Sequence, residues 1–172
     1  MRIAKLASIV ALLVAPVVLS GCSMLGLGGP PPLCEDQSVK NYVQTVNEAN
    51  TNVNDAATRI GELVTRLQND PSLVNESSWQ NAMDGEVQKI MDANNQIQNL
   101  SSPRQELSVA HDMITGAFQN YSDGAQGLQQ GINQGDAQRI QDAFQTIQEG
   151  DNKLSGAQDE LNSVLSNCQW YQ

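Results

Sequence analysis

The chain has 172 residues, of which 40% are hydrophobic, and its 19 acidic and 9 basic residues give a net charge of −10. Nucleic-acid binding requires clustered Lys and Arg that neutralise phosphates. The sequence has no such cluster, so it excludes a nucleic-acid partner. Gln and Asn are frequent (20 and 16 residues). Because they fall mainly between the hydrophobic positions, they predict solvated, uncharged helix faces.

The N-terminus has the order of a secretion signal. Arg2 and Lys5 precede a nearly continuous apolar run over residues 6–19, and two small residues follow that run. The apolar run is short for a membrane-spanning helix. We therefore expect a signal peptide over residues 1–21, with an uncleaved anchor as the alternative.

The motif Leu19-Ser20-Gly21-Cys22 resembles the lipobox of bacterial lipoproteins. The resemblance is confined to residues 1–23 and leaves the mature domain unassigned. It implies that the preceding peptide is removed and that Cys22 carries several acyl chains such as palmitate. More than one chain is needed because a single chain binds a membrane only marginally. Ser23 is not acidic, and the resemblance then favours the outer membrane in a host with two membranes. An ordinary cleaved signal is the alternative.

Residues 22–34 form the lipidated cysteine and a tether. Glycines give the tether flexibility, and Pro30-Pro31-Pro32 favours an extended polyproline form. At about 3.3 Å per residue, the tether over residues 23–33 reaches roughly 35 Å at full stretch. Removing Arg2 and Lys5 leaves 7 basic and 19 acidic residues, a net charge of −12 for the mature chain. This acidic surface makes adhesion to anionic lipids unfavourable, so the lipid on Cys22 is the expected membrane contact.

The cysteine count predicts one disulfide. With Cys22 acylated, Cys34 and Cys168 remain as a pair in an oxidising compartment. An internal disulfide between them would enclose almost the whole domain. Two free thiols, or a disulfide between molecules, are the alternatives.

After Cys34 the sequence is helical throughout. Apolar residues recur at alternating spacings of three and four, and no stretch alternates as a strand would. The predicted helices cover residues 36–69, 77–100, 103–132 and 136–168, with Ser102 capping the third helix and Pro103 in its first turn. Four long helices with short connections predict an all-α fold, an antiparallel up-down-up-down four-helix bundle over residues 35–172. This topology would bring Cys34 and Cys168 to the same end.

Six glycines lie inside the last two predicted helices, although each costs about 1 kcal/mol relative to Ala there. Close approach of neighbouring helices and local plasticity are both possible reasons. The six are Gly116, Gly124, Gly127, Gly131, Gly150 and Gly156.

No catalytic or metal-binding motif is present. The sequence has one histidine, His111, whereas a zinc or di-iron site requires several His, Cys or acidic ligands at defined spacings. Its neighbour Asp112 points elsewhere on a helix, so the two make a poor catalytic dyad. We therefore expect no enzyme activity, no metal and no cofactor.

Apolar residues at spacings of three and four line one side of each predicted helix, which we call its seam. Three seam positions hold a polar residue instead: Asn50, Asn94 and His111. Pairing the helices across the predicted turns places all three near one level. We expect a hydrogen-bonded layer that specifies helix register. A small-ligand pocket is one alternative, including noncovalent haem bound by His111 and either Met91 or Met113. The other alternative is that the helices pair in a different register, so that the three residues do not lie at one level.

The pair Trp170-Tyr171 follows Cys168 directly. We expect these side chains to cover the end of the bundle, with contact to the membrane interface or a partner as the alternative. Together these features predict a lipid-anchored extracytoplasmic protein with a non-catalytic binding or envelope-structural role and a protein partner of unknown identity. A carrier of a small ligand or haem is the alternative.

Overall fold

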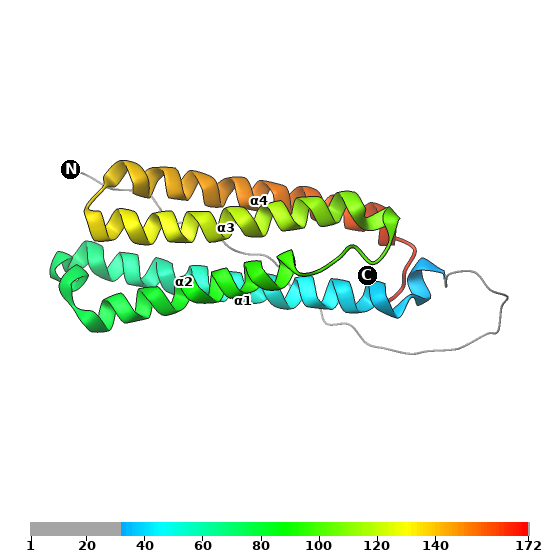
Figure 1. Cartoon of the computed structure of the whole chain (residues 1–172), viewed down its shortest axis with the longest axis horizontal. Helices are drawn as coiled ribbons and strands as arrows, with labels where there is room; N and C mark the ends of the chain where they lie inside the picture. The colour runs from blue at the N-terminus through cyan, green and yellow to red at the C-terminus, as the bar shows by residue number, and fades with distance from the viewer. Residues whose placement is uncertain (1–31, 172) are drawn as a thin grey trace.

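The computed structural model describes residues 32–171, which form four long α-helices joined by short connections (Figure 1). The described residues contain no strand. The predicted all-α fold is therefore confirmed. The helices are α1 (Gln37–Asn69), α2 (Ser77–Gln98), α3 (Ser108–Gln134) and α4 (Ala137–Leu165).

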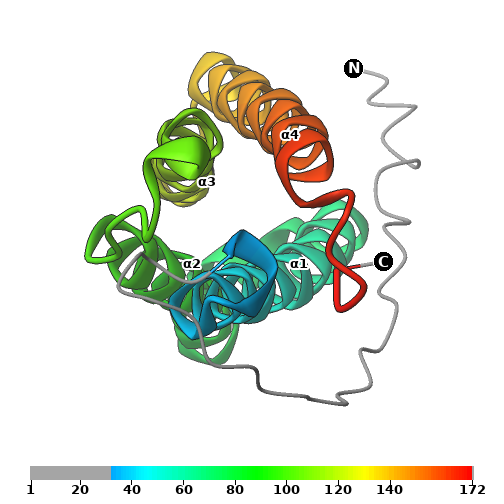
Figure 2. The ribbon, with the colours of Figure 1, turned by 90° about the vertical axis from the view of Figure 1, so that its right-hand side faces the viewer.

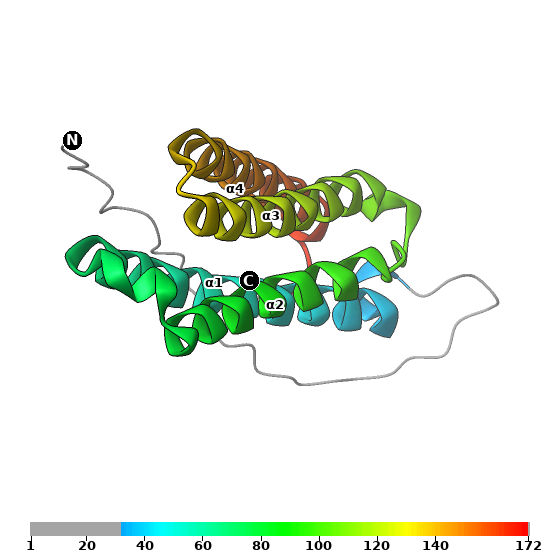
Figure 3. The same cartoon turned by 60° about the vertical axis from the view of Figure 1, so that its left-hand side comes forward.

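The helices lie in two stacked pairs, α1 beside α2 and α3 beside α4 (Figures 1 and 3). The view along the long axis places α3 near α2, and α4 on the same side as α1 (Figure 2). Contact between α3 and α4 is the most extensive, and α1–α2 and α2–α3 contacts follow. Direct contact between α1 and α4 is slight by comparison. The α1–α4 side is thus the least closely packed side of the molecule.

Side-chain caps and a glycine define three of the helix ends. The carboxylate of Asp36 accepts a hydrogen bond from the backbone N–H of Ser38 at the start of α1. The carboxylate of Asp136 accepts hydrogen bonds from the backbone N–H groups of the second and third residues of α4, Gln138 and Arg139. Gly135 ends α3 with φ of +66°, a left-handed conformation that residues with a Cβ adopt at a cost.

The connection between α2 and α3 differs from the sequence-based expectation. α3 begins at Ser108 rather than at residue 103, after a 3₁₀ turn over Gln105–Leu107. Arg104 before that turn is extended (φ −147°, ψ 146°), and the Ser102 hydroxyl donates to the Arg104 carbonyl rather than accepting from a helix N–H. The predicted Ser102 cap is therefore wrong. The ion pair between Arg104 and Asp36 (3.2 Å) fixes this connection against the start of α1.

The helix-interior glycines allow α3 and α4 to approach closely. A Cβ on Gly131 would lie 2.9 Å from the backbone nitrogen of Ile140, and one on Gly150 would lie 3.1 Å from the carbonyl oxygen of Ala117. Real Cβ atoms are rarely so near a facing backbone, and the backbone cannot move without moving the helix. Of the two explanations left open by the sequence, close approach accounts for both positions.

The core is continuous and draws on all four helices. Val39 on α1, Ile97 on α2, Phe118 on α3 and Leu165 on α4 have no exposed surface. Among residues 32–171, no helix is long and apolar enough to cross a membrane.

Candidate functional site

The predicted acylation site, Cys22, lies outside the described residues. The described chain starts at Pro32, and Cys34 follows within the first 3₁₀ turn, Leu33–Glu35. The site that can be described is therefore the end of the domain to which the tether is attached.

That end is closed by contacts between the two termini of the domain. The Sγ atoms of Cys34 and Cys168 are 2.07 Å apart, a disulfide bond as the cysteine count predicts. The indole nitrogen of Trp170 donates to the Cys34 carbonyl (2.7 Å). The Lys40 ammonium lies 5.8 Å from the centre of the Trp170 ring, within range of a cation–π interaction. Tyr171 also packs against the core, so both aromatic residues cover the end of the helices.

The Arg104–Asp36 ion pair belongs to the same end. Only 18% of the Arg104 side chain and 13% of the Asp36 side chain are exposed. Hydrogen bonding from the Ser38 hydroxyl holds the pKa of Asp36 below its usual value, and Arg104 adds to this effect. The charged groups of this end therefore act as partners for one another within the chain.

The three polar seam residues have separate environments. Asn94 is buried, accepts from the Gln98 amide (3.2 Å) and donates to Gln119 (3.5 Å). His111 is half-buried, and its Nδ1 shares a 3.1 Å hydrogen bond with the Tyr42 hydroxyl. Asn50 is also half-buried. The structure records no hydrogen bond joining any two of Asn50, Asn94 and His111, so they do not form the single network that was expected.

The late start of α3 explains the difference. Asn94 pairs with Gln119, and Gln98 donates to the Thr115 carbonyl (3.0 Å). Continuing this register places His111 opposite the α2–α3 connection, beyond the end of α2. His111 is eight residues from Gln119, or about 12 Å along a helix. The sequence-based pairing assumed a short turn and thus placed His111 too close to Asn94.

Two buried tyrosines, Tyr42 and Tyr121, make polar contacts through their hydroxyl groups. Burial, and secondarily the charge of Asp112, raises the pKa of Tyr42 to about 12. The Tyr121 hydroxyl donates to Asp151 (2.8 Å), and burial raises the pKa of Tyr121 as well. Tyr121 falls within the apolar heptad pattern of the third predicted helix, and Tyr42 lies beside that of the first. The pattern therefore indicates burial of both rings, whereas the partners of their hydroxyl groups depend on how the helices pair.

The residues required by the haem alternative are engaged in contacts within the chain. Nδ1 of His111 is bonded to Tyr42. The methyl group of Met113 lies over Gly156, where a Cβ would come within 2.6 Å of it. Met91 is partly buried against the core. These contacts give the carrier alternative no additional support.

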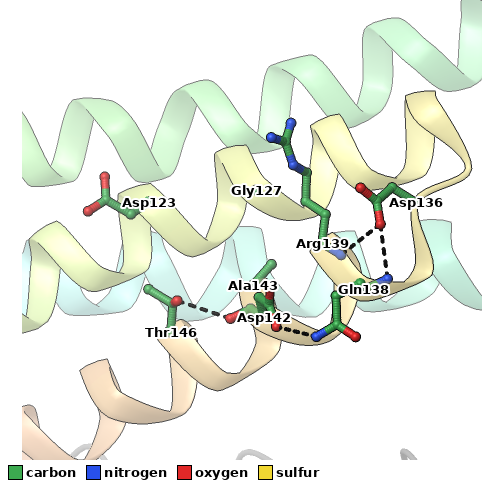
Figure 4. Close-up of a pocket in the computed structure, with 8 residues that line it drawn as sticks. All are labelled: Asp123, Gly127, Asp136, Gln138, Arg139, Asp142, Ala143 and Thr146. Atoms are coloured by element: carbon green, nitrogen blue, oxygen red, sulfur yellow. Dashed lines mark hydrogen bonds between the residues drawn. The ribbon is translucent and has the colours of Figure 1, made fainter.

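A shallow depression of about 400 Å³ lies between α3 and α4 near their connection (Figure 4). Its polar groups already have partners. Asp136 caps α4, Gln138 donates to Asp142 (2.8 Å), and Arg139 donates to Gln130 (2.8 Å). The depression therefore offers no obvious set of free groups to a ligand. Its lining consists of Asp123, Gly127, Asp136, Gln138, Arg139, Asp142, Ala143 and Thr146.

Residues 32–171 contain no group of three or more His, Cys, Asp or Glu side chains arranged to hold a metal ion. Comparison with known proteins found no matching family model, no matching curated protein and no matching solved structure. Function must therefore be argued from the chain itself.

Proposed function

We propose that the protein is a bacterial lipoprotein, held on the extracytoplasmic side of a membrane by acyl chains on Cys22 after removal of residues 1–21. The observation that carries this proposal is the motif Leu19-Ser20-Gly21-Cys22, placed directly after an apolar run. The disulfide supports it, because structural disulfides persist in oxidising compartments. In a host with two membranes, the outer membrane is the expected location.

The mature domain is an up-down-up-down four-helix bundle with a non-catalytic role in binding or in envelope structure. Two features support this part of the proposal. The acidic, amide-rich surface is suited to solvent and to polar protein contacts, and polar groups that line the α3–α4 depression have hydrogen-bond partners within the chain. The disulfide and Trp170 close the end nearest the tether, so the remaining helix surface is available to a partner.

Metabolic labelling with a fatty acid tests the anchor. The parent chain should incorporate label, and Cys22→Ala should incorporate none and keep its signal peptide, because acylation and cleavage both depend on this cysteine. Ser23→Ala is the matched control and should be labelled like the parent. Equal label in Cys22→Ala and the parent would refute the assignment. Membrane fractionation of the same samples separates inner from outer membrane.

A further inference from the structure

One side of the molecule, which we call the α1–α4 face, has uncharged side chains along its length. Its members repeat every seven residues, so they line one flank of each helix. On α1 they are Asn47, Asn54, Gly61 and Gln68, and on α4 they are Gln141, Gln148 and Ser155. All are exposed except Asn54, which is half-buried.

The burial pattern shows which way these flanks point. On α1 the buried flank is Tyr42, Ala49, Ala56 and Leu63, and the Leu63 carbonyl accepts from Trp79 of α2. The uncharged flank is therefore the one turned away from α2. Lys40, seven residues before Asn47, lies against Trp170 after the end of α4, which places this flank on the side of α4.

On α4 the buried flank is Ala143, Gly150 and Ala157, which packs on α3. The uncharged flank of α4 is consequently turned away from α3 and toward the side of α1. Because α1 and α4 touch only slightly, the apolar side chains between them are incompletely covered. The partly buried apolar residues that border the face are Val64, between Gly61 and Gln68, and Phe144, between Gln141 and Gln148.

The charged residues of α1 lie elsewhere on the helix. Glu48, Asp55 and Glu62 form a row about 100° around the helix from the face. Arg59 and Arg66 form a second row on the opposite side of α1. Asp151, at the border of the face, is half-buried and accepts from Tyr121. On α4, Asp142 and Glu149 lie about 100° around the helix from the face, and Asp159 adjoins only its last member, Ser155. In a mature chain with a net charge of −12, the rest of this surface has no free carboxylate.

We propose that the α1–α4 face is the contact surface of a homodimer, in which a second copy of this chain covers it. A copy of this protein is itself strongly acidic, so two copies can meet only where like charges are absent. Amide side chains donate and accept hydrogen bonds, and a face of amides is therefore complementary to itself. A twofold dimer requires such self-complementarity because the same patch is used on both subunits.

The composition of the face also argues for this occupant over a basic protein. A basic partner would be recognised through carboxylates, and those lie on the other surfaces of the molecule. Protein–protein interfaces have a core that is apolar and poor in charge and a rim that is polar. The α1–α4 face has the same arrangement, with partly exposed apolar residues at its centre and amides around them. The proposal goes beyond the function proposed above and does not require Cys22 to be acylated.

Sedimentation equilibrium of the full chain in density-matched detergent tests the proposal. The parent should be a concentration-dependent dimer. Asn54→Asp combined with Gln148→Glu places two carboxylates per copy on the face and should weaken the dimer by about tenfold or more. The control combines Asn52→Asp with Asn81→Asp, which adds the same charge at exposed positions outside the face and should leave dissociation nearly unchanged.

Charge reversal gives a second and stricter test. Asn54→Lys combined with Gln148→Lys should also be monomeric alone, but mixing it with the acidic variant should restore a dimer containing one copy of each. The circular dichroism of every variant should match that of the parent, because the substituted side chains make no recorded hydrogen bond. The proposal is overturned by a monomeric parent, by equal weakening in the control, or by failure of the mixed pair to associate. Loss of the dimer leaves the acylation test on Cys22 unaffected, so the two proposals fail separately.

Discussion

The indole nitrogen of Trp170 donates a 2.7 Å hydrogen bond to the carbonyl oxygen of Cys34, 136 residues earlier in the chain. This bond lies beside the Cys34–Cys168 disulfide, so both ends of the domain are held by one covalent and one polar contact. The Trp170 ring also faces Lys40 in the first turns of α1. The last residues of the chain thus complete the packing of the first helix.

We expect reduction of the disulfide to lower the melting temperature and to leave the far-UV helical signal largely intact. The bond closes a separation of 134 residues, and for so long a loop the chain-entropy model gives about 4–5 kcal/mol of stabilisation. Cys34→Ser combined with Cys168→Ser should reproduce the effect of reduction. The measurement is thermal unfolding with and without reductant.

Trp170→Phe is the comparison variant, because it keeps the disulfide and an aromatic ring and removes the hydrogen bond to Cys34, whose loss costs about 0.5–1.5 kcal/mol. Free thiols at both cysteines in protein from its native compartment would contradict the prediction. An unchanged melting temperature on reduction would do the same.

A second prediction concerns the close contact of α3 and α4. Gly131→Ala should destabilise the fold by about 1–3 kcal/mol, because the added methyl group would meet the backbone of Ile140. Gly85→Ala is the matched control. A Cβ on Gly85 has nothing within 4 Å, so that change should stabilise α2 by up to about 1 kcal/mol through helix propensity.

Urea unfolding of the two variants distinguishes these outcomes. If both substitutions stabilise the protein, the glycines of α3 do not serve close approach. The sign of the change in unfolding free energy for Gly131→Ala is the decisive quantity, because the propensity gain measured with Gly85→Ala is common to both variants.

The sequence predicted the helices well because each has a long seam of apolar residues and three ends carry strong local signals. Asp36, Asp136 and Gly135 act through groups within a few residues, and such local chemistry is readable from sequence. The start of α3 was not predicted, because Arg104 is held extended by an ion pair with Asp36, 68 residues earlier. A contact at that separation has no local signature.

The same dependence on distant contacts explains why the burial of Asn94 was predicted and its hydrogen-bond partner was not. Burial of Asn94 followed from its seam position, whereas its partner Gln119 depended on the register between α2 and α3. An error of a few residues in one connection moves a pairing by two helical turns. The sequence also did not predict which flank of α1 faces away from α2. A heptad pattern shows which side of a helix is buried, but not which neighbouring helix packs closer to it.

The third prediction is a loss of stability at high pH. Burial raises the pKa of Tyr42 to about 12, against about 10 for tyrosine in an unfolded chain. Between these values the folded state keeps a proton that the unfolded state loses, so stability is complete below pH 10 and falls as pH rises toward 12. Tyr42→Phe should show a shallower decline. Urea midpoints measured from pH 8 to 12 test this, and identical slopes for parent and variant would contradict it.

The last prediction separates the two polar pairs. Tyr42 and His111 share a hydrogen bond, so Tyr42→Phe and His111→Ala should be coupled, with an interaction energy of about 0.5–3 kcal/mol. Asn94 and His111 have different partners and lie about two helical turns apart, so Asn94→Ala and His111→Ala should add to within about 0.5 kcal/mol. Double-mutant cycles by urea unfolding measure both pairs under one set of conditions. Coupling between Asn94 and His111 with none between Tyr42 and His111 would restore the single polar layer and would mean that α3 starts closer to residue 103.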